Sequence, residues 1–318
     1  MRRDTDVRIL LTGASSFTGF WFASELARMG HDVTATFRGQ PDTYGDVRGA
    51  RVQQLMEQVN PVWGTSFGSE LFLDLVGAAQ FDLFCHHAAE TANYRGWDFD
   101  TLAASASNTR NARSVLQRLA ERGCKRVIVT GTVFEPYEGR DDCSQRAFSP
   151  YGLSKHISFE LFRLEAYPIG MKLGKFVIPN PFGPYEEPRF TSYMMREWSE
   201  GRVPAVQTPY YLRDNIHVSL LARAYAHFCE TSDDGTALVT KCSPSGYVET
   251  QAAFAQRFAR EIGTRLGRNL EVKLSTQRDF SEPIVRANLE PAVDLVPEWF
   301  EDDAWEELCA YYRARFLQ

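Results

Sequence analysis

A tyrosine and a lysine stand four positions apart in the segment SPYGLSK, at Tyr151 and Lys155. If Pro150 occupies the first turn of a helix, this spacing places both side chains on one helix face. A phenol with a pKa of about 10 is a poor acid or base at neutral pH, but a nearby ammonium group lowers that pKa. The pair therefore predicts a proton-transferring tyrosine supported by a lysine, against the alternative of a half-exposed helix face.

Hydroxyl groups precede this pair at the end of a predicted strand. The segment KRVIVTG at 125–131 reads as a strand, and Thr130 and Thr132 lie at its end. Ligands of open parallel sheets bind at the carboxyl ends of the strands. Thr130 could there donate a hydrogen bond to a substrate carbonyl near Tyr151, or it could simply cap the strand.

A glycine-containing segment, TGASSFTG at 12–19, lies between the apolar run RILL and a helical pattern. Gly13 permits a tight turn, and Gly19 permits close packing of the helix on the strand. The first turn of the helix would then direct free N–H groups at a pyrophosphate. Ser16 stands at the middle position, and its small side chain is compatible with phosphate. The segment predicts a dinucleotide site, against the alternative of a purely structural turn.

The end of the second strand indicates which nucleotide binds. The segment HDVTATF is followed by Arg38, with no Asp or Glu to accept hydrogen bonds from ribose hydroxyls. An arginine can pair with a 2′-phosphate, whereas a carboxylate would repel it. We therefore expect NADP(H) in preference to NAD(H); the alternative is a solvated Arg38 with relaxed specificity.

These residues require a scaffold of alternating strands and helices. Strand patterns occur at 7–13, 31–37, 81–85, 125–131 and 174–179, and helical patterns at 18–29, 100–122 and 150–166. Such alternation predicts an α/β fold, a Rossmann-type doubly wound parallel sheet. We expect a dinucleotide-binding domain over 1–179, with later segments crossing back, and a smaller C-terminal α/β substrate lobe over 180–318.

Composition excludes several classes of protein. The 318-residue chain has a net charge of -6 without a basic cluster, which argues against nucleic-acid binding. No segment is apolar enough to span a membrane, and none resembles a signal peptide. The six cysteines form no C-x-x-C pair, so we expect reduced thiols, a cytoplasmic location and no metal site.

Taken together and in this order, the segments resemble the extended branch of the short-chain dehydrogenase/reductase superfamily, and within it the nucleotide-sugar epimerase/dehydratase/reductase group. The segments that carry the resemblance are TGASSFTG, HHAAE, SNTRNARSVL, VTGTVF, YGLSK, NPFGPYE and RDNIHV. They extend from about residue 8 to residue 220 in the family's order.

The resemblance implies roles for individual residues. Tyr151 would be the general acid/base, Lys155 its electrostatic partner and Thr130 the catalytic hydroxyl. Asn180 and Arg213 match positions that contact the diphosphate of a sugar nucleotide, and Thr132 is a second hydroxyl on the substrate side. We expect cofactor contacts from Gly13, Ser15, Ser16, Phe17, Gly19, Arg38, His87, Ala88 and Lys155. His87 would line the cofactor site or pack beneath it rather than act in catalysis.

Two departures from the family pattern reduce the number of reactions that the protein is expected to catalyse. Gly131 and Thr132 stand where 4,6-dehydratases carry Asp-Glu. This chain therefore has no acid and base there to eliminate water from the sugar. The 3,5-epimerase/4-reductases carry a cysteine at the position of Thr132, so their reaction is also disfavoured here. We therefore expect NADP(H)-dependent reduction of a keto group on a nucleotide-activated sugar; the alternative is a 4-epimerase with tightly bound NAD. The resemblance also implies a homodimer formed through a four-helix bundle.

Overall fold

The computed structural model describes residues 7–141, 146–231 and 237–317. The chain forms two compact units. The first unit comprises residues 1–138, 146–178 and 225–242, and the second comprises 139–145, 179–224 and 243–318. The segment 225–242 thus returns to the first unit after the chain has entered the second.

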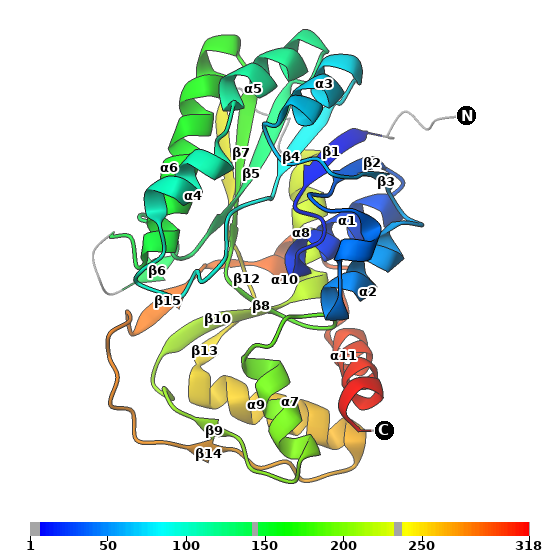
Figure 1. Cartoon of the computed structure of the whole chain (residues 1–318). Coiled ribbons are helices and arrows are strands. Elements are labelled where there is room, and N and C mark those ends of the chain that lie inside the picture. The colour runs from blue at the N-terminus through cyan, green and yellow to red at the C-terminus, as the bar shows by residue number, and fades with distance from the viewer. Residues whose placement is uncertain (1–6, 142–145, 232–236, 318) are drawn as a thin grey trace. The chain divides into compact units, whose positions relative to one another are not determined.

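A seven-stranded parallel sheet forms the centre of the first unit, in the order β11-β7-β5-β4-β1-β2-β3 (Figure 1). This arrangement confirms the predicted Rossmann-type α/β fold. Its strands are β1 (Arg8–Thr12), β2 (Asp32–Thr36), β3 (Asn60–Val62), β4 (Leu83–His86), β5 (Arg126–Thr132), β7 (Lys172–Ile178) and β11 (Val239–Cys242).

Helices cover both faces of this sheet, as a doubly wound fold requires. On one face, apolar side chains of α3 (Glu70–Ala78), α5 (Ala112–Glu121) and α6 (Pro150–Ala166) form a core with the central strands. On the other face, Phe22 of α1 (Phe17–Arg28) stacks on Tyr225 of α8 (Val218–Thr231), with ring centroids 4.0 Å apart. Helix α2 (Asp46–Leu55) packs beside α1. Short 3-10 turns at Pro41–Thr43 and Tyr167–Ile169 complete the unit.

The single helix expected over 100–122 is wrong. The segment forms two helices, α4 (Thr101–Asn108) and α5, separated by a break. Asn111 adopts a left-handed backbone conformation there, with φ of 53°, and its side-chain amide donates to the carbonyl of Gly68. This bond links positions 43 residues apart, so the helical periodicity of the segment could not predict it.

The second unit contains a mixed sheet in the order β13-β10-β15-β6, with β8 paired to β10. These strands are β6 (Arg140–Asp141), β8 (Asn180–Phe182), β10 (Leu212–His217), β13 (Tyr247–Thr250) and β15 (Val285–Ala287). Its helices are α7 (Phe190–Ser199), α9 (Gln251–Leu266), α10 (Ala292–Leu295) and α11 (Glu301–Phe316). Two further two-stranded pairs join β9 (Ala205–Val206) to β14 (Lys273–Leu274) and β12 (Pro244–Ser245) to β16 (Glu290–Pro291).

Aromatic side chains dominate the core of the second unit. Phe182, Phe254, Phe258, Trp305 and Tyr312 come from β8, α9 and α11 and are all buried. The tryptophan ring of Trp305 lies 5.6 Å from that of Phe182. This core fixes β8 and β10, the two strands that carry the predicted substrate residues of this unit.

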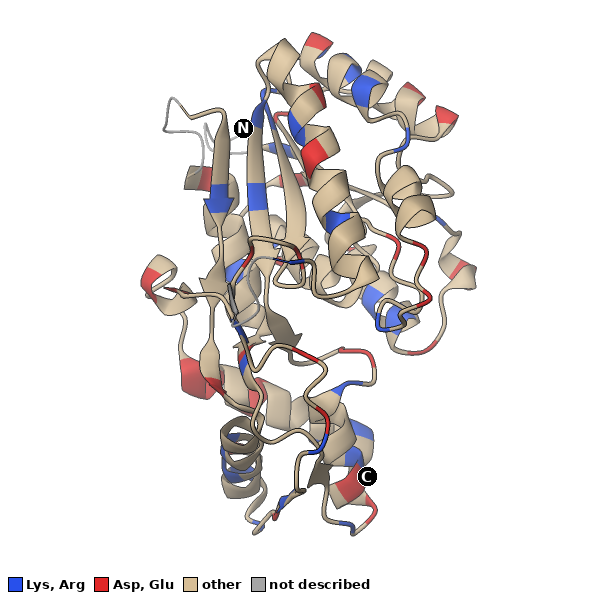
Figure 2. Ribbon diagram, turned by 90° about the vertical axis from the view of Figure 1, so that its left-hand side faces the viewer, with Lys and Arg blue, Asp and Glu red and all other residues tan. Residues whose placement is uncertain are grey.

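Charged residues of both signs and buried thiols are spread over the described chain. Lys and Arg residues are interspersed with Asp and Glu along the ribbon (Figure 2). Five cysteines are free thiols and buried, while Cys143 lies outside the described residues. Within the described residues, no helix is both long and apolar enough to cross a membrane.

Candidate active site

The glycine-containing segment forms a tight turn from β1 into α1. Gly13 has a φ of +81°, and a Cβ atom there would lie 2.8 Å from the backbone nitrogen of Ala88. A Cβ atom on Gly19 would lie 2.2 Å from the carbonyl oxygen of Gly13. Ser16 caps α1, since its hydroxyl accepts from the N–H of Gly19. A side chain at Gly13 or Gly19 would fill this turn, so the local geometry fits close approach of a pyrophosphate to the start of α1.

Two histidines lie at the carboxyl end of β4, near this turn: His86 is the last residue of the strand and His87 follows it. His86 is buried and bonds to Thr12 through Nδ1 at 3.1 Å and to the carbonyl of Asn108 through Nε2 at 3.1 Å. His87 is only partly buried, and its Nδ1 lies 3.0 Å from Oγ1 of Thr130. Burial, with the positive charge of Lys155, lowers the pKa of His87 to about 3, so the ring is neutral at physiological pH.

The end of β5 presents two buried threonines, and a buried carboxylate lies beside them. Thr130 is 3% exposed and Thr132 6% exposed. Glu135 accepts the backbone N–H of Thr132 at 2.8 Å and forms an ion pair with Lys175 at 2.6 Å. A Cβ atom on Gly131 would lie 2.8 Å from the carboxylate of Glu135. An aspartate at position 131, which a 4,6-dehydratase would need, would therefore require the side chains of Glu135 and Lys175 to shift.

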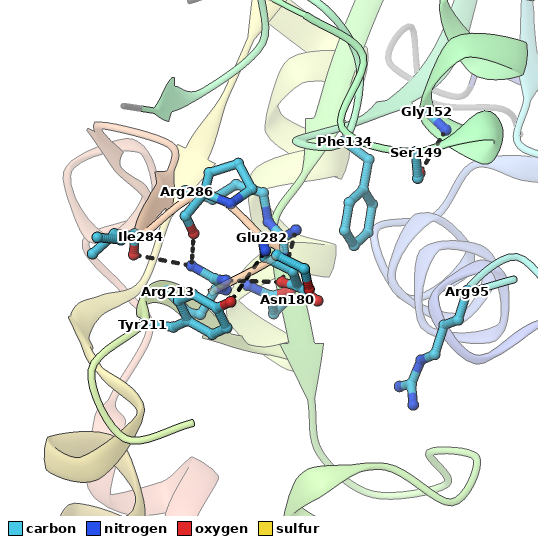
Figure 3. Close-up of polar contacts among 12 residues, drawn as sticks. Arg95, Phe134, Ser149, Gly152, Asn180, Tyr211, Arg213, Glu282, Ile284 and Arg286 are labelled. Atoms are coloured by element: carbon cyan, nitrogen blue, oxygen red, sulfur yellow. Dashed lines mark hydrogen bonds and ion pairs between the residues drawn. The ribbon is translucent and has the colours of Figure 1, made fainter. Parts of the chain in front are cut away.

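Tyr151 and Lys155 lie one turn apart at the start of α6, as the sequence predicts. Ser149 caps this helix by accepting the N–H of Gly152 (Figure 3), and Pro150 occupies the first turn. A Cβ atom on Gly152 would lie 2.0 Å from the carbonyl oxygen of Phe134, so glycine allows α6 to begin directly against the segment after β5. The ring of Tyr151 lies 6.2 Å from that of Phe134.

Lys155 is a buried cation in this group. Burial lowers its pKa to about 8, while the negative charge of Glu135 opposes this shift and Lys175 reinforces it. Lys155 is 5% exposed and remains mostly protonated at neutral pH. A cation of this kind favours the phenolate form of a neighbouring tyrosine. The first unit thus brings Thr130, Tyr151 and Lys155 to one end of the sheet.

Three arginines follow the end of β2, one before α2 and two on it. Arg38 follows β2 with its side chain 65% exposed and 4.0 Å from the carboxylate of Glu90. Arg48 donates to the hydroxyl of Ser15 at 2.7 Å, and buried Arg51 donates to the carbonyl of Ser15 at 3.1 Å. The sequence singled out Arg38 alone. Arg48 and Arg51 lie about one turn apart on α2, a weakly amphipathic helix whose sequence pattern did not single them out.

Phe37 and the other residues of the turn take structural positions. Phe37 is 1% exposed and stacks on Trp63 at 4.5 Å, so it belongs to the core. Phe17 is 2% exposed. Ala88 donates its backbone N–H to Thr12 at 3.1 Å. These residues therefore shape the turn, and any cofactor contact they make is through the backbone or a small surface.

In the second unit, the predicted substrate residues Asn180 and Arg213 already have protein partners (Figure 3). The Asn180 amide donates to the carbonyl of Asp214 at 3.0 Å, joining β8 to β10. Arg213 is 2% exposed and donates to the Glu282 carboxylate at 2.8 Å. Its other guanidinium nitrogen donates to the carbonyl groups of Leu212, Pro283 and Ile284.

Glu282 also faces a second arginine. The guanidinium of Arg286 lies 3.5 Å from the same carboxylate, and Arg286 is itself 5% exposed. The ring of Tyr211 lies 4.2 Å from the Arg213 guanidinium. Two arginines therefore converge on one carboxylate. The pattern RDNIHV pointed to Arg213, but no motif pointed to Glu282, which lies 69 residues further along the chain.

Comparison with known proteins identifies the family of this architecture. Residues 9–239 match the family model described as the NAD dependent epimerase/dehydratase family. A search of curated protein sequences gave no significant match.

Solved structures with the same fold include nucleotide-sugar enzymes. UDP-glucose 4-epimerase from Thermotoga maritima, solved with UDP-glucose, is 16% identical with a TM-score of 0.72, covering 98% of this chain and 100% of that one. UDP-glucuronic acid 4-epimerase from Bacillus cereus is 15% identical with a TM-score of 0.75, covering 97% and 100%. The dTDP-glucose 4,6-dehydratase DesIV from Streptomyces venezuelae, solved with NAD, is 17% identical with a TM-score of 0.72, covering 96% and 97%. At these identities the likeness establishes the shared fold.

Proposed function

Because the chain belongs to the NAD dependent epimerase/dehydratase family, an enzyme family of the short-chain dehydrogenase/reductase type, we propose that it reduces a keto group of a nucleotide-activated sugar with NADP(H). The observation that carries this proposal is the grouping of Thr130 at the end of β5 with Tyr151 and Lys155 at the start of α6. The nucleotide-sugar ligands named for the similar structures support the substrate class.

Each of the three residues has a distinct task in such a reduction. The reduced nicotinamide, when bound, supplies a hydride to the carbonyl carbon. The hydroxyl of Thr130 donates a hydrogen bond to the carbonyl oxygen and orients it. Tyr151 donates its proton to that oxygen, and Lys155 stabilises the phenolate that remains. Lys155 carries the required charge because its pKa of about 8 lies above neutral pH.

The arginines beside the turn support NADP(H) as the cofactor. No carboxylate ends β2, where an acidic side chain would repel a 2′-phosphate. Arg38 and Arg48 place two cations on this side of the turn, and Arg48 is held by Ser15. Arginine suits a phosphate because its donors form a planar fork.

The alternative is a 4-epimerase with tightly bound NAD, which would use the same three residues. The named activities of two similar structures favour this alternative. A 4,6-dehydratase is disfavoured, because Gly131 and Thr132 supply no acid or base. Both oxygens of the nearby Glu135 are engaged, one by the N–H of Thr132 and one by Lys175.

Turnover assays distinguish the two reactions. Purified protein is incubated with NADPH or NADH and a panel of UDP-, dTDP- and GDP-linked 4-keto sugars. Oxidation of NADPH with matching formation of the alcohol supports the reductase. Interconversion of UDP-glucose and UDP-galactose without added cofactor, and no oxidation of NADPH with any keto sugar, would replace it by the epimerase.

Arg213 suggests how a diphosphate would be bound in the second unit. A diphosphate that contacts Arg213 must compete with the Glu282 carboxylate, which holds the guanidinium at 2.8 Å. Glu282→Gln removes this competing charge, so we expect the affinity for UDP to rise about three- to tenfold. Isothermal titration with UDP measures this change.

Glu197→Gln is the matched control, since Glu197 on α7 pairs with Arg202, which follows the helix, at 2.8 Å within the same unit. It should leave UDP affinity unchanged. If Glu282→Gln leaves the affinity unchanged or weakens it, Arg213 does not exchange this carboxylate for the phosphates of the ligand.

A homodimer through α4 and α6 is the proposed assembly. Leu153, Ile157, Leu161 and Leu164 recur at helical spacing on α6; the three leucines are exposed, and Leu102 on α4 is 76% exposed. Helices α4 and α6 pack against each other, so their exposed apolar side chains can form one surface.

Replacing two of these leucines by charged residues tests the assembly. Leu102→Arg combined with Leu164→Arg should convert a dimer into a monomer, because arginines would be buried without partners. Sedimentation equilibrium measures the mass. Leu71→Arg, at a 60% exposed position on α3, should leave the mass unchanged. Were the double variant to keep the wild-type dimer mass, the interface would have to lie elsewhere.

A further inference from the structure

The imidazole ring of His87 bridges Thr130 to the turn before α1. Its Nδ1 lies 3.0 Å from Oγ1 of Thr130, and its Nε2 lies 3.0 Å from Oγ1 of Thr18 and 3.1 Å from Oγ of Ser16. The ring packs edge-on against Phe22, with centroids 5.1 Å apart. One neutral histidine therefore connects three hydroxyl groups, and these contacts limit where its single ring proton can reside.

The hydroxyl proton of Ser16 is already used, because it donates to the carbonyl oxygen of Gly13 at 2.9 Å. Within the described residues, the side chains of Thr18 and Thr130 have no hydrogen-bond partner other than His87. If Nε2 carries the proton, the hydroxyl of Thr18 has no acceptor, and the hydroxyl of Thr130 donates its proton to Nδ1. If Nδ1 carries the proton, Thr18 donates to Nε2 and His87 donates to Thr130. Each arrangement leaves one hydroxyl proton without an acceptor among these groups, that of Thr18 in the first and that of Thr130 in the second, and only the second leaves the hydroxyl of Thr130 free to donate to a substrate.

We propose that His87, protonated on Nδ1, is a positioning residue that directs the hydroxyl proton of Thr130 toward the substrate carbonyl. The effect rests on the proposed function, since it matters only if Thr130 donates to a substrate. A hydroxyl that accepts one hydrogen bond becomes a stronger donor of the next. The group runs from Thr18 on α1 through His87 to Thr130, so it joins the predicted cofactor turn to the reacting end of β5.

His86 provides an internal reference with the opposite proton position. The hydroxyl oxygen of Thr12 accepts the N–H groups of His87 and Ala88, so its own proton goes to Nδ1 of His86. The Nε2 atom of His86 faces the carbonyl oxygen of Asn108, which can only accept. His86 must therefore carry its proton on Nε2. Two adjacent histidines are expected to differ in tautomer.

Long-range ¹⁵N–¹H NMR of protein labelled on its six histidines tests the tautomers directly, without a substrate. The signals that disappear in His87→Phe belong to His87, and Phe can fill the same space beside Phe22. We expect the Nδ1–H pattern for His87 and the Nε2–H pattern for His86, unchanged between pH 6 and pH 9. An Nε2–H pattern for His87, or a ring that gains a proton in this range, overturns the proposal.

Kinetic measurements then test the consequence for Thr130. We expect His87→Phe to lower kcat about three- to tenfold with KM nearly unchanged, and His87→Asn, which retains an amide donor, to restore most of the loss. In a Thr130→Val background, His87→Phe should have no further effect. Equal losses in both backgrounds would assign His87 a merely structural role.

The outcomes separate this proposal from the proposed function. If the NMR tautomers are as expected but Thr130→Val leaves turnover unchanged, the catalytic role of Thr130 fails and with it the role of His87. If Thr130→Val lowers turnover but His87 is protonated on Nε2, only the inference about His87 fails.

Discussion

Replacing Tyr151 by phenylalanine is expected to lower the rate of hydride transfer by about 10²–10⁴-fold, the usual contribution of a positioned general acid. The substitution removes only the hydroxyl group, while the ring keeps its contacts with Tyr94 and Phe134 at 5.5 Å and 6.2 Å. Cofactor affinity should therefore change by less than about threefold. Single-turnover oxidation of bound NADPH with a keto-sugar nucleotide measures the rate.

Tyr167→Phe is the matched control, because Tyr167 lies at the end of the same helix and is 70% exposed. It should retain wild-type turnover and thermal stability. A Tyr151→Phe enzyme with a rate within threefold of wild type would remove Tyr151 from the reaction. Loss of activity together with loss of the folded state would instead report instability, so far-ultraviolet circular dichroism accompanies the assay.

Removal of Arg38 or Arg48 is expected to abolish the proposed preference for NADPH. Arg38→Ala and Arg48→Ala should each lower NADPH affinity about tenfold, since each loses a charge-assisted hydrogen bond to the 2′-phosphate. NADH lacks this phosphate, and its affinity should change by less than about twofold. Fluorescence titration of the two reduced cofactors measures both affinities.

Arg28→Ala tests whether any loss of positive charge has the same effect. Arg28 lies in the last turn of α1 and pairs with Glu25 at 2.6 Å. It should alter neither affinity. If Arg38→Ala and Arg48→Ala weaken NADH and NADPH equally, these arginines support the fold of the turn and do not select the cofactor.

The sequence predicted those helices and strands whose bounds depend on residues close together in the chain. The helix predicted over 150–166 has these bounds in the structure, because Ser149 caps it and Pro150 suits its first turn. The central parallel strands followed from runs of apolar residues that both faces of the sheet bury. Tyr151 and Lys155 share a helix face for the same local reason.

Features that depend on contacts distant in sequence were not predictable in this way. The break at Asn111 depends on a bond to Gly68, and the partner of Arg213 comes from a segment 69 residues away. The weakly amphipathic helix that carries Arg48 gave no clear periodic signal, so its contact with Ser15 was missed. The link from His87 to Thr130 likewise requires the register of β4 and β5 in the sheet.

Identification of the nucleotide carried by the purified protein tests the central claim, that this enzyme is an NADP(H)-dependent reductase, most directly. The protein is denatured, the released nicotinamide nucleotide is identified and quantified by mass spectrometry, and the affinities for NADPH and NADH are compared. We expect either bound NADP(H), or a cofactor-free protein that binds NADPH at least tenfold more tightly than NADH. NAD or NADH recovered in near-stoichiometric amount would contradict the reductase and support the epimerase.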